Sequence, residues 1–348
     1  MKKLLYLSLV VLLMCCISCS EDFLSDQNLP DDVAIDMELS KKAPEYGGIT
    51  LPNNFSSYIF YDGITGPDGL HVLNKNKLLV GKEYGGKEGI YLAKRGTTFN
   101  PGRDAFSTLG FNSPDDITAD MNGVLYVADG QAFTVFKITR NGRPPTVFVT
   151  RGSETTNSFD PFGVTIAPSG FDGPNVDPGD LIVCDNAGGD ASLWGVWAVN
   201  RATGLAKVLA QGSAFENGPI NAAFNSEGTL FVSLNNGGSG PNKLVTLLPY
   251  NPNDPNDPYG KIAPFADDLS APFIAIHPLT DDIYCKKNTT QLHFIPKGGG
   301  ASTLFATNVG VNDDGTQDMA FNKQGTALYI CHRDEKRVIE IYSHRNNW

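Results

Sequence analysis

Acidic and amide side chains recur beside turns along this 348-residue chain, and they are the residues best suited to chemistry. Carboxylate and amide oxygens are the ligands that Ca²⁺ takes in proteins. Two carboxylates about 5 Å apart repel by roughly 3 kcal/mol at an effective dielectric of 20, so convergence would call for a cation or a raised pKa. The candidate metal ligands are Asp68, Asp115, Asp116, Asn221 and Asp318.

A second set of polar residues follows apolar runs and could bind an organic ligand. His332 lies among them and is the candidate catalytic base, with Asp318 or Asp334 as a possible partner. The other histidines show no paired metal spacing, and no Ser-based elbow, Walker loop or Cys-rich zinc pattern occurs in the sequence. The candidate ligand-binding residues are Glu83, Asp129, Asp185, Asn186, Asn235, Asn236 and Arg333.

These residues belong to six similar units, each made of a polar turn, an apolar run, a tight turn and a second apolar run. The first unit runs from Gly66 to Glu83, GPDGLHVLNKNKLLVGKE. Units of about 50 residues with short alternating runs between Gly, Asn and Asp turns predict an all-β, six-bladed β-propeller with four-stranded blades. The residues after the turn proline or its equivalent are Asp68, Asp115, Phe162, Ile220, Phe273 and Gln317.

The ends of the chain predict how the ring closes. The sixth unit stops after Val338–Tyr342 because the chain ends at Trp348, so it lacks an outer strand. The segment Ser57–Tyr61 lies just before the first unit, in the same position that each outer strand has before the unit that follows it. We therefore predict that this N-terminal strand closes the last blade and covers its edge.

Strand order places the polar residues at one end of the central tunnel. The turn before the first strand of a unit and the loop after its second strand meet at the same face, so an acidic mouth is expected there. The formal net charge of −11 argues against nucleic acid as a partner.

One motif resembles a known group of propellers. The sequence from Pro114 to Ile117, followed by Gly123 to Asp129, looks like the NHL-repeat and SMP-30/gluconolactonase-like six-bladed propellers, and the resemblance covers about Ser56 to Tyr342. In lactonases of that group one ligand of an axial divalent ion comes from a Pro-Asp-Gly turn, which Asp68 matches. The chain lacks a Glu-Gly-Pro at its first inner strand, so the resemblance implies the fold more than the activity.

The N-terminus has the layout of an export signal. Three residues, Met1 to Lys3, precede an apolar stretch that is too short to span a bilayer. The sequence from Cys16 to Ser20 resembles a bacterial lipoprotein processing site, which implies lipidation at Cys19; a plain cleaved signal is the alternative. The expected domains are residues 1–19 as a lipoprotein signal peptide, 20–48 as a flexible tether and 49–348 as the propeller.

Two interpretations of function follow. The preferred one is an exported, monomeric outer-membrane lipoprotein, exposed at the cell surface, that touches the membrane only through its anchor and binds a small molecule, glycan or protein at the acidic mouth. The alternative is an SMP-30/gluconolactonase-like hydrolase of lactones or esters, in which Ca²⁺ polarises the carbonyl. A scaffold that uses only its rim is a third possibility.

Overall fold

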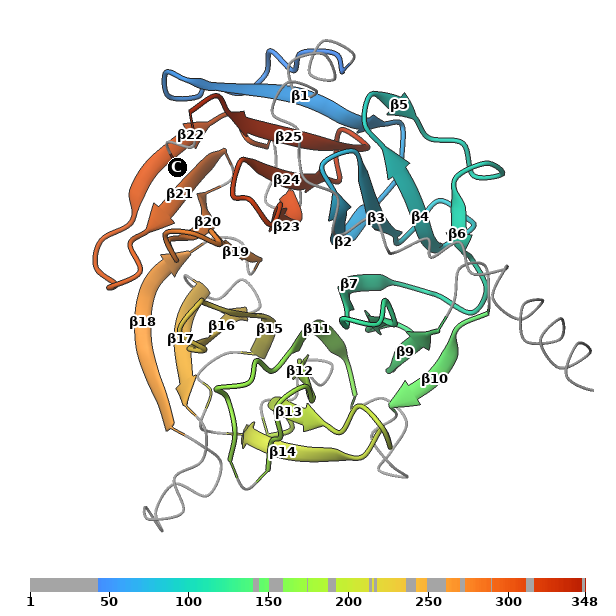
Figure 1. The fold of residues 1–348 in the computed structure, drawn as a ribbon, viewed down its shortest axis with the longest axis vertical. Helices are drawn as coiled ribbons and strands as arrows, with labels where there is room; N and C mark the ends of the chain where they lie inside the picture. The colour runs from blue at the N-terminus through green and yellow to red at the C-terminus, as the bar shows by residue number, and fades with distance from the viewer. Residues whose placement is uncertain are drawn as a thin grey trace, which may run out of the picture.

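The described residues form a ring of β-sheets (Figure 1). The innermost strands of the ring line a central channel. The computed structural model describes residues 43–139, 144–149, 159–173, 175–186, 192–212, 215, 218–235, 242–248, 261–269, 273–288, 290–310, 316–345 and 348. Within them the chain forms six sheets, which confirms the predicted all-β, six-bladed propeller. No helix in this part of the chain has the length and apolarity that a membrane span requires.

Blades 1 to 5 each consist of four antiparallel strands, ordered in sequence from the channel outward. Blade 1 contains β2 (Pro67–Asn74), β3 (Lys77–Lys82), β4 (Gly89–Lys94) and β6 (Ala105–Ser107). Blade 2 contains β7 (Pro114–Ala119), β8 (Leu125–Asp129), β9 (Thr134–Ile138) and β10 (Thr146–Val149). Blade 3 contains β11 (Pro161–Ile166), β12 (Leu181–Asp185), β13 (Gly195–Val199) and β14 (Ala206–Gln211).

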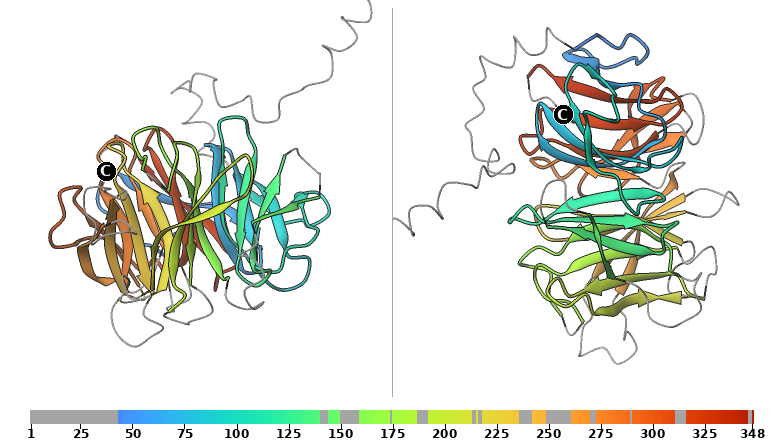
Figure 2. Two further views of the ribbon diagram at one scale, coloured as in Figure 1. Left: turned by 90° about the horizontal axis from the view of Figure 1, so that it is seen from below. Right: turned by 90° about the vertical axis from the view of Figure 1, so that its right-hand side faces the viewer.

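The next two blades repeat this order. Blade 4 contains β15 (Gly218–Phe224), β16 (Leu230–Asn235), β17 (Asn242–Leu248) and β18 (Lys261–Leu269). Blade 5 contains β19 (Ile274–Ile276), β20 (Ile283–Asn288), β21 (Gln291–Ile295) and β22 (Thr303–Thr307). Figure 2 shows the ring edge-on, with the strands running between its two faces. We call the face where the innermost strands begin the turn face, and the face with the hairpins to the second strands the hairpin face.

Blade 6 joins the two ends of the described chain. It contains β23 (Thr316–Phe321), β24 (Ala327–His332), β25 (Arg337–Ser343) and, outermost, the N-terminal β1 (Phe55–Asp62). Strand β1 pairs antiparallel with β25, with Ser57 opposite Ile341, so the predicted closing strand is confirmed. The two-residue β5 (Thr97–Thr98) adds a parallel pairing outside β1, which the sequence pattern did not predict.

The second strand of a blade is covered by neighbouring blades on both sides. Strands β8, β12 and β24 are buried at every position, which explains their continuous apolar runs. Asx turns hold several of the hairpins that follow the inner strands, as at Asn74, Asp120 and Asn225. In blade 2, Oδ1 of Asp120 accepts hydrogen bonds from the backbone N–H groups of Asn122 and Val124. The inner strands are therefore fixed at their hairpin ends.

Residues 43–51 pack against the outside of the ring. Thr50 forms a bridge with Thr307 of β22, and the Tyr46 hydroxyl donates a hydrogen bond of 2.8 Å to Oε1 of Glu335. Residues 43–48, which the sequence analysis assigns to the tether, thus lie on the propeller. The proposed signal peptide with Cys19 and the rest of the tether lie outside the described residues.

Candidate functional site

The innermost strands line the channel, one from each blade (Figure 1). Several begin with a register irregularity, as between Pro114 and Asp116 in β7 and between Pro219 and Asn221 in β15. A bulge of this kind redirects the side chains that follow it. The aligned residues after this point, in blade order, are Gly69, Asp116, Gly163, Asn221, Ile274 and Asp318. Side-chain acceptors therefore enter the channel from alternate blades.

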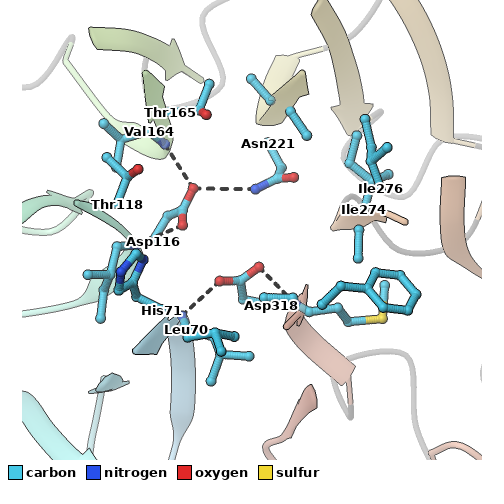
Figure 3. A pocket seen from close by; sticks show the side chains of 18 of the residues that line it. Leu70, His71, Asp116, Thr118, Val164, Thr165, Asn221, Ile274, Ile276 and Asp318 are labelled. Atoms are coloured by element: carbon cyan, nitrogen blue, oxygen red, sulfur yellow. Dashed lines mark hydrogen bonds between the residues drawn. The ribbon is translucent and has the colours of Figure 1, made fainter. Parts of the chain in front are cut away.

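A pocket of about 430 Å³ begins at these acceptors and follows the inner strands toward the hairpin face (Figure 3). Side chains two residues apart on a strand share a face, so the next aligned residues form a second layer. On blades 1 to 3 this layer is polar, and on blades 4 to 6 it is small or apolar. Its members, all lining the pocket, are His71, Thr118, Thr165, Ala223, Ile276 and Ala320.

Asp116 connects three blades at the end of the pocket. Its side chain is 6% exposed and accepts hydrogen bonds from the backbone N–H of Ile117 at 2.7 Å and of Val164 in blade 3 at 2.9 Å. Nδ2 of Asn221 in blade 4 lies 3.4 Å from the same Oδ2. Burial raises the pKa of Asp116 to about 7, and the two backbone hydrogen bonds oppose this shift.

Asp318 occupies the corresponding place in blade 6. Its Oδ2 accepts a hydrogen bond of 2.7 Å from the backbone N–H of Leu70 in blade 1, and its Oδ1 accepts one from Met319. Burial, followed by the charge of Asp116, raises the pKa of Asp318 well above its usual range. Within the described part of the chain, neither carboxylate forms an ion pair.

Asn221 completes the group of acceptors. Its side chain is 4% exposed, and its Oδ1 has no hydrogen-bond partner in the described structure. Figure 3 shows the ends of the Asp116, Asn221 and Asp318 side chains converging within the channel. A buried carbonyl oxygen without a donor is costly, so this atom is a place where a ligand donor would be stabilising.

Asp68, another predicted metal ligand, lies in a different cluster. Its Oδ2 accepts a hydrogen bond of 2.5 Å from Nη2 of Arg333, which also forms an ion pair with Glu83 and lies over the ring of Tyr84. Burial raises the pKa of Asp68 to about 8, although the charge of Arg333 opposes this shift. Arg333, a predicted ligand-binding residue, therefore forms ion pairs with the predicted metal ligand Asp68 and with Glu83, another predicted ligand-binding residue.

Asp115 and Asp129 organise the loops of blade 2. Asp115 accepts hydrogen bonds from the Ser113 hydroxyl at 3.0 Å and the Gly130 N–H at 2.8 Å. Burial and the charge of Asp68 raise the pKa of Asp115 well above its usual range. The fully buried Asp129 accepts three backbone N–H groups, one of them from Ser113. These carboxylates hold the turn before β7 against the loop after β8.

The remaining ligand-binding candidates lie at the turn face of blades 3 and 4. Asp185 is fully buried and accepts a hydrogen bond of 2.9 Å from the Asp160 N–H. The backbone of Asn186 donates to the Asp160 carbonyl, and Asn235 ends β16 opposite Gly218. Asn236 lies outside the described residues. None of the described members of this group lines the pocket.

His332 is the last residue of β24 and is fully buried. Its Nδ1 accepts a hydrogen bond of 3.4 Å from the Glu335 N–H, and burial lowers its pKa. It does not line the pocket, so the structure does not bring it together with Asp116, Asn221 and Asp318.

The sequence analysis missed the second layer of the pocket. His71, which lines it, has a buried Nε2 without a partner, and burial lowers its pKa to about 4. The signal was present as a period of two along the inner strands, which places Thr118 on the face of Asp116 and Thr165 on the face of Gly163.

Comparisons with known proteins identify the architecture. No family model and no curated protein matches the chain. A gluconolactonase of Xanthomonas campestris shares its fold with a TM-score of 0.60 and 12% identity, over 86% of this chain and 96% of that one. The PQQ-bound aldose sugar dehydrogenase of Streptomyces coelicolor has a TM-score of 0.55 and 14% identity, over 84% and 99%.

A further solved structure has the same architecture. The calcium structure of a Trichoderma reesei carbohydrate-active enzyme of family AA12 has a TM-score of 0.56 and 11% identity, over 86% of this chain and 98% of that one. At such low identity these likenesses show the fold alone. The resemblance to gluconolactonase-like propellers is thus confirmed at the level of the fold, and the chain is a six-bladed β-propeller similar to those of gluconolactonases and sugar dehydrogenases.

Proposed function

We propose that this propeller binds a small molecule in its central channel, where Asp116, Asn221 and Asp318 hold the polar group of the ligand. The observation that carries the proposal is the unpartnered, buried Oδ1 of Asn221 beside two carboxylates that lack ion-pair partners in the described structure. The pocket of about 430 Å³ is in the size range of small-molecule sites. This proposal moves the ligand from the rim of the acidic mouth into the channel.

The test is a ligand screen by thermal unfolding and calorimetry on the full chain, with neutral sugars, lactones, carboxylates and amines as probes. Ala223→Phe would fill the second layer of the pocket, whereas Ala202→Phe alters an exposed turn residue and serves as the matched control. We expect at least one compound to bind the parent chain and the control, and to bind the Ala223→Phe variant at least tenfold more weakly. Binding that is equal in both variants would place the ligand elsewhere.

A Ca²⁺-dependent lactone or ester hydrolase is the second candidate. Among the described residues no group of three or more His, Cys, Asp or Glu side chains is placed to hold a metal ion. The fit therefore depends on the Oδ1 of Asn221 as a third oxygen beside Asp116 and Asp318, with water completing the six to eight ligands of Ca²⁺. When bound, the ion would polarise the carbonyl of an ester substrate.

Calorimetric titration of Ca²⁺ into the metal-stripped chain tests this candidate. We expect Asp318→Asn to weaken Ca²⁺ binding if the ion lies in the channel, and Asp68→Asn to weaken it if the ion lies near Arg333. Lactone hydrolysis that requires Ca²⁺ and is lost in the same variant would support the hydrolase. An absence of Ca²⁺ binding would remove it.

The cellular location is a separate proposal. We propose that the chain is exported and anchored to the outer membrane through a lipid on Cys19, and that it is a monomer. Labelling of cells with a fatty-acid analogue would test the anchor, because Cys19→Ala should abolish the label. Equal labelling of the variant would contradict the proposal.

A further inference from the structure

We infer that the ligand of the channel carries a primary ammonium group, which donates its hydrogen atoms to Asp116, Asn221 and Asp318. This inference rests on the proposed small-molecule function and specifies the chemical class of the ligand. The three acceptors come from blades 2, 4 and 6, at aligned positions of the inner strands. Alternate positions in a ring of six have approximate threefold symmetry, and a primary ammonium presents three N–H donors with that symmetry.

The hydrogen bonds already present leave room for these donors. Each oxygen of Asp116 and Asp318 accepts a backbone N–H, and a carboxylate oxygen can accept two hydrogen bonds. Oδ1 of Asn221 accepts none within the described structure. Its Nδ2 points to Asp116, and this contact turns Oδ1 away from that carboxylate (Figure 3).

Charge favours an ammonium over a neutral donor. Some other buried carboxylates of the described structure have a cation, as Asp120 has Arg201 at 3.2 Å and Asp68 has Arg333. Asp116 and Asp318 have none in the described structure, and the charge of Asp116 raises the pKa of Asp318. A ligand cation between them would remove this repulsion and compensate both buried charges.

The count of N–H donors separates the ammonium from other cations. A quaternary ammonium has the charge but cannot donate to the amide oxygen. A neutral alcohol can donate once but brings no charge. A divalent cation satisfies all three oxygens but needs several more ligands. Among these groups, the primary ammonium matches both the charge and the three acceptors.

The second layer limits the rest of the ligand. One side presents His71, Thr118 and Thr165, and the other side presents Ala223 and Ile276. A body with an apolar face and a polar edge fits both sides. The exposed Lys323 lines the pocket at its hairpin end and would repel a second positive charge, so a monoamine is favoured over a diamine.

The experiment compares matched probes by calorimetry on the full chain. Phenethylamine is titrated beside its N-methyl, N,N-dimethyl and N,N,N-trimethyl derivatives and the neutral 2-phenylethanol. Glucosamine and glucose form a second pair, which shows whether the site prefers a sugar or an apolar ring beside the ammonium group. We expect at least tenfold weaker binding of the trimethyl derivative and of each neutral partner than of the primary amine, with the other methylated amines between them.

Variants link the binding to the three acceptors. Asp318→Asn removes one charge, and Asn221→Leu removes the unpartnered oxygen with little change in volume. We expect each to weaken binding of the primary amine at least tenfold. The control is Asp62→Asn, because this carboxylate is 44% exposed and ends β1, the outer strand of blade 6; the variant should leave binding unchanged. Unfolding curves identify a variant that has lost its fold, and the probe series on the unmodified chain then decides alone.

The outcomes separate this inference from the proposed function. Equal affinity for phenethylamine and its trimethyl derivative, or for phenethylamine and 2-phenylethanol, would overturn the ammonium assignment. If neutral compounds bind, are blocked by Ala223→Phe and no amine binds, the small-molecule function stands and the ammonium class fails. If only CaCl₂ binds at these residues, the metal site replaces it. If none of these probes binds, the ammonium inference fails; if no compound of the wider screen binds either, both proposals fail.

Discussion

Three buried aspartates near the channel differ in their hydrogen-bond and ion-pair partners. Asp129 accepts three backbone N–H groups of its own loops, and Asp68 is paired with Arg333. Asp116 accepts backbone donors from two blades but has no cation in the described structure. Asp116 and Asp318, unlike Asp68 and Asp129, also line the pocket, which is why these two aspartates are the ones we assign to a ligand.

The pKa of Asp116 predicts a measurable pH dependence of stability. It is raised to about 7, above that of an unfolded chain, so the folded state binds more protons between pH 4 and 7 and the free energy of unfolding falls as pH rises. From pH 5 to pH 8 this group contributes a loss of about 2 to 3 kcal/mol. We expect Asp116→Asn to remove that part of the loss, measured by denaturant unfolding at both pH values.

The neighbouring carboxylates provide the comparison. Asp68, Asp115 and Asp318 also have raised pKa values, so the variant keeps a residual loss of the same sign. Between pH 5 and pH 8, the free energy of unfolding of the surface variant Asp62→Asn should fall by as much as that of the unmodified chain. A loss in Asp116→Asn as large as in that control would show that Asp116 is not the titrating group.

At this scale the sequence predicted the set of candidate residues but not their grouping. Asp68 and Asp115 follow the turn proline and were expected on the axis with Asp116, Asn221 and Asp318. The register irregularity of the inner strands instead sends the residue one place later into the pocket. Such a shift depends on backbone hydrogen bonds to the second strand, and no residue type marks it.

Glycine on the inner strands of blades 1 and 3 lets neighbouring blades come close. A Cβ added to Gly163 of β11 would lie 2.5 Å from the carbonyl oxygen of Ile220 and 2.8 Å from Cα of Asn221. Both are backbone atoms, which cannot move aside without shifting β15. We expect Gly163→Ala to destabilise the protein by about 1 to 3 kcal/mol, measured by denaturant unfolding.

A matched control shows whether the lack of room for a Cβ at Gly163 causes the loss of stability. Gly170 has nothing within 4 Å of an added Cβ, so Gly170→Ala should leave stability nearly unchanged. Because the clash displaces Asn221, Gly163→Ala should also weaken any ligand that Asn221 holds. Equal stability of the two variants would contradict the close approach of β11 and β15.

A buried ion pair fixes blade 6 beside blade 1. Nη2 of Arg95, which follows β4, lies 2.6 Å from Oε2 of Glu340 in β25, and both side chains are less than a tenth exposed. Removing one partner leaves the other charged and buried, which costs about 3 to 5 kcal/mol. We expect Arg95→Met and Glu340→Gln each to destabilise the protein by this amount in denaturant unfolding.

The double variant, Arg95→Met with Glu340→Gln, measures the interaction free energy between the two side chains. Since it leaves neither charge buried alone, it should be less destabilised than the sum of the two single variants. Additive losses would mean that the two side chains act independently.

The elements were largely readable from the sequence. Six units with one missing outer strand and one spare strand leave a single closure, and β1 fills it. Strand β5 could not be predicted, because two residues, Thr97 and Thr98, carry no periodicity and their pairing depends on where the closed ring places β1. The packing of residues 43–51 depends on Tyr46 meeting Glu335, a contact between segments nearly 290 residues apart.

At the level of the whole molecule, the fold leaves the chemistry open. Propellers with this architecture include a gluconolactonase and a PQQ-bound sugar dehydrogenase, at 12% and 14% identity to this chain. The inner strands of this chain present a particular set of side chains, with acceptors on alternate blades. Function must therefore be argued from that set and tested on it.

Ring closure predicts how the molecule responds to truncation. Strand β1 supplies the outer strand of blade 6, and its Phe60 and Tyr61 are fully buried. A chain that starts at residue 43 keeps this strand, whereas a chain that starts at residue 63 exposes the edge of β25 and the core between blades 6 and 1. By scanning calorimetry we expect the first to unfold in one transition at the Tm of the full chain, and the second to lose that transition.

A chain that starts at residue 49 separates the contribution of Tyr46 from that of β1. It keeps the closing strand but loses the hydrogen bond from Tyr46 to Glu335, the buried ring and two backbone hydrogen bonds between residues 44–46 and β1. Its Tm should fall by a few degrees while the single transition remains, because one aromatic contact contributes on the order of 1 kcal/mol beyond its buried area. A single transition at the full Tm in the chain from residue 63 would contradict closure by β1, since blade 6 would then be stable with three strands.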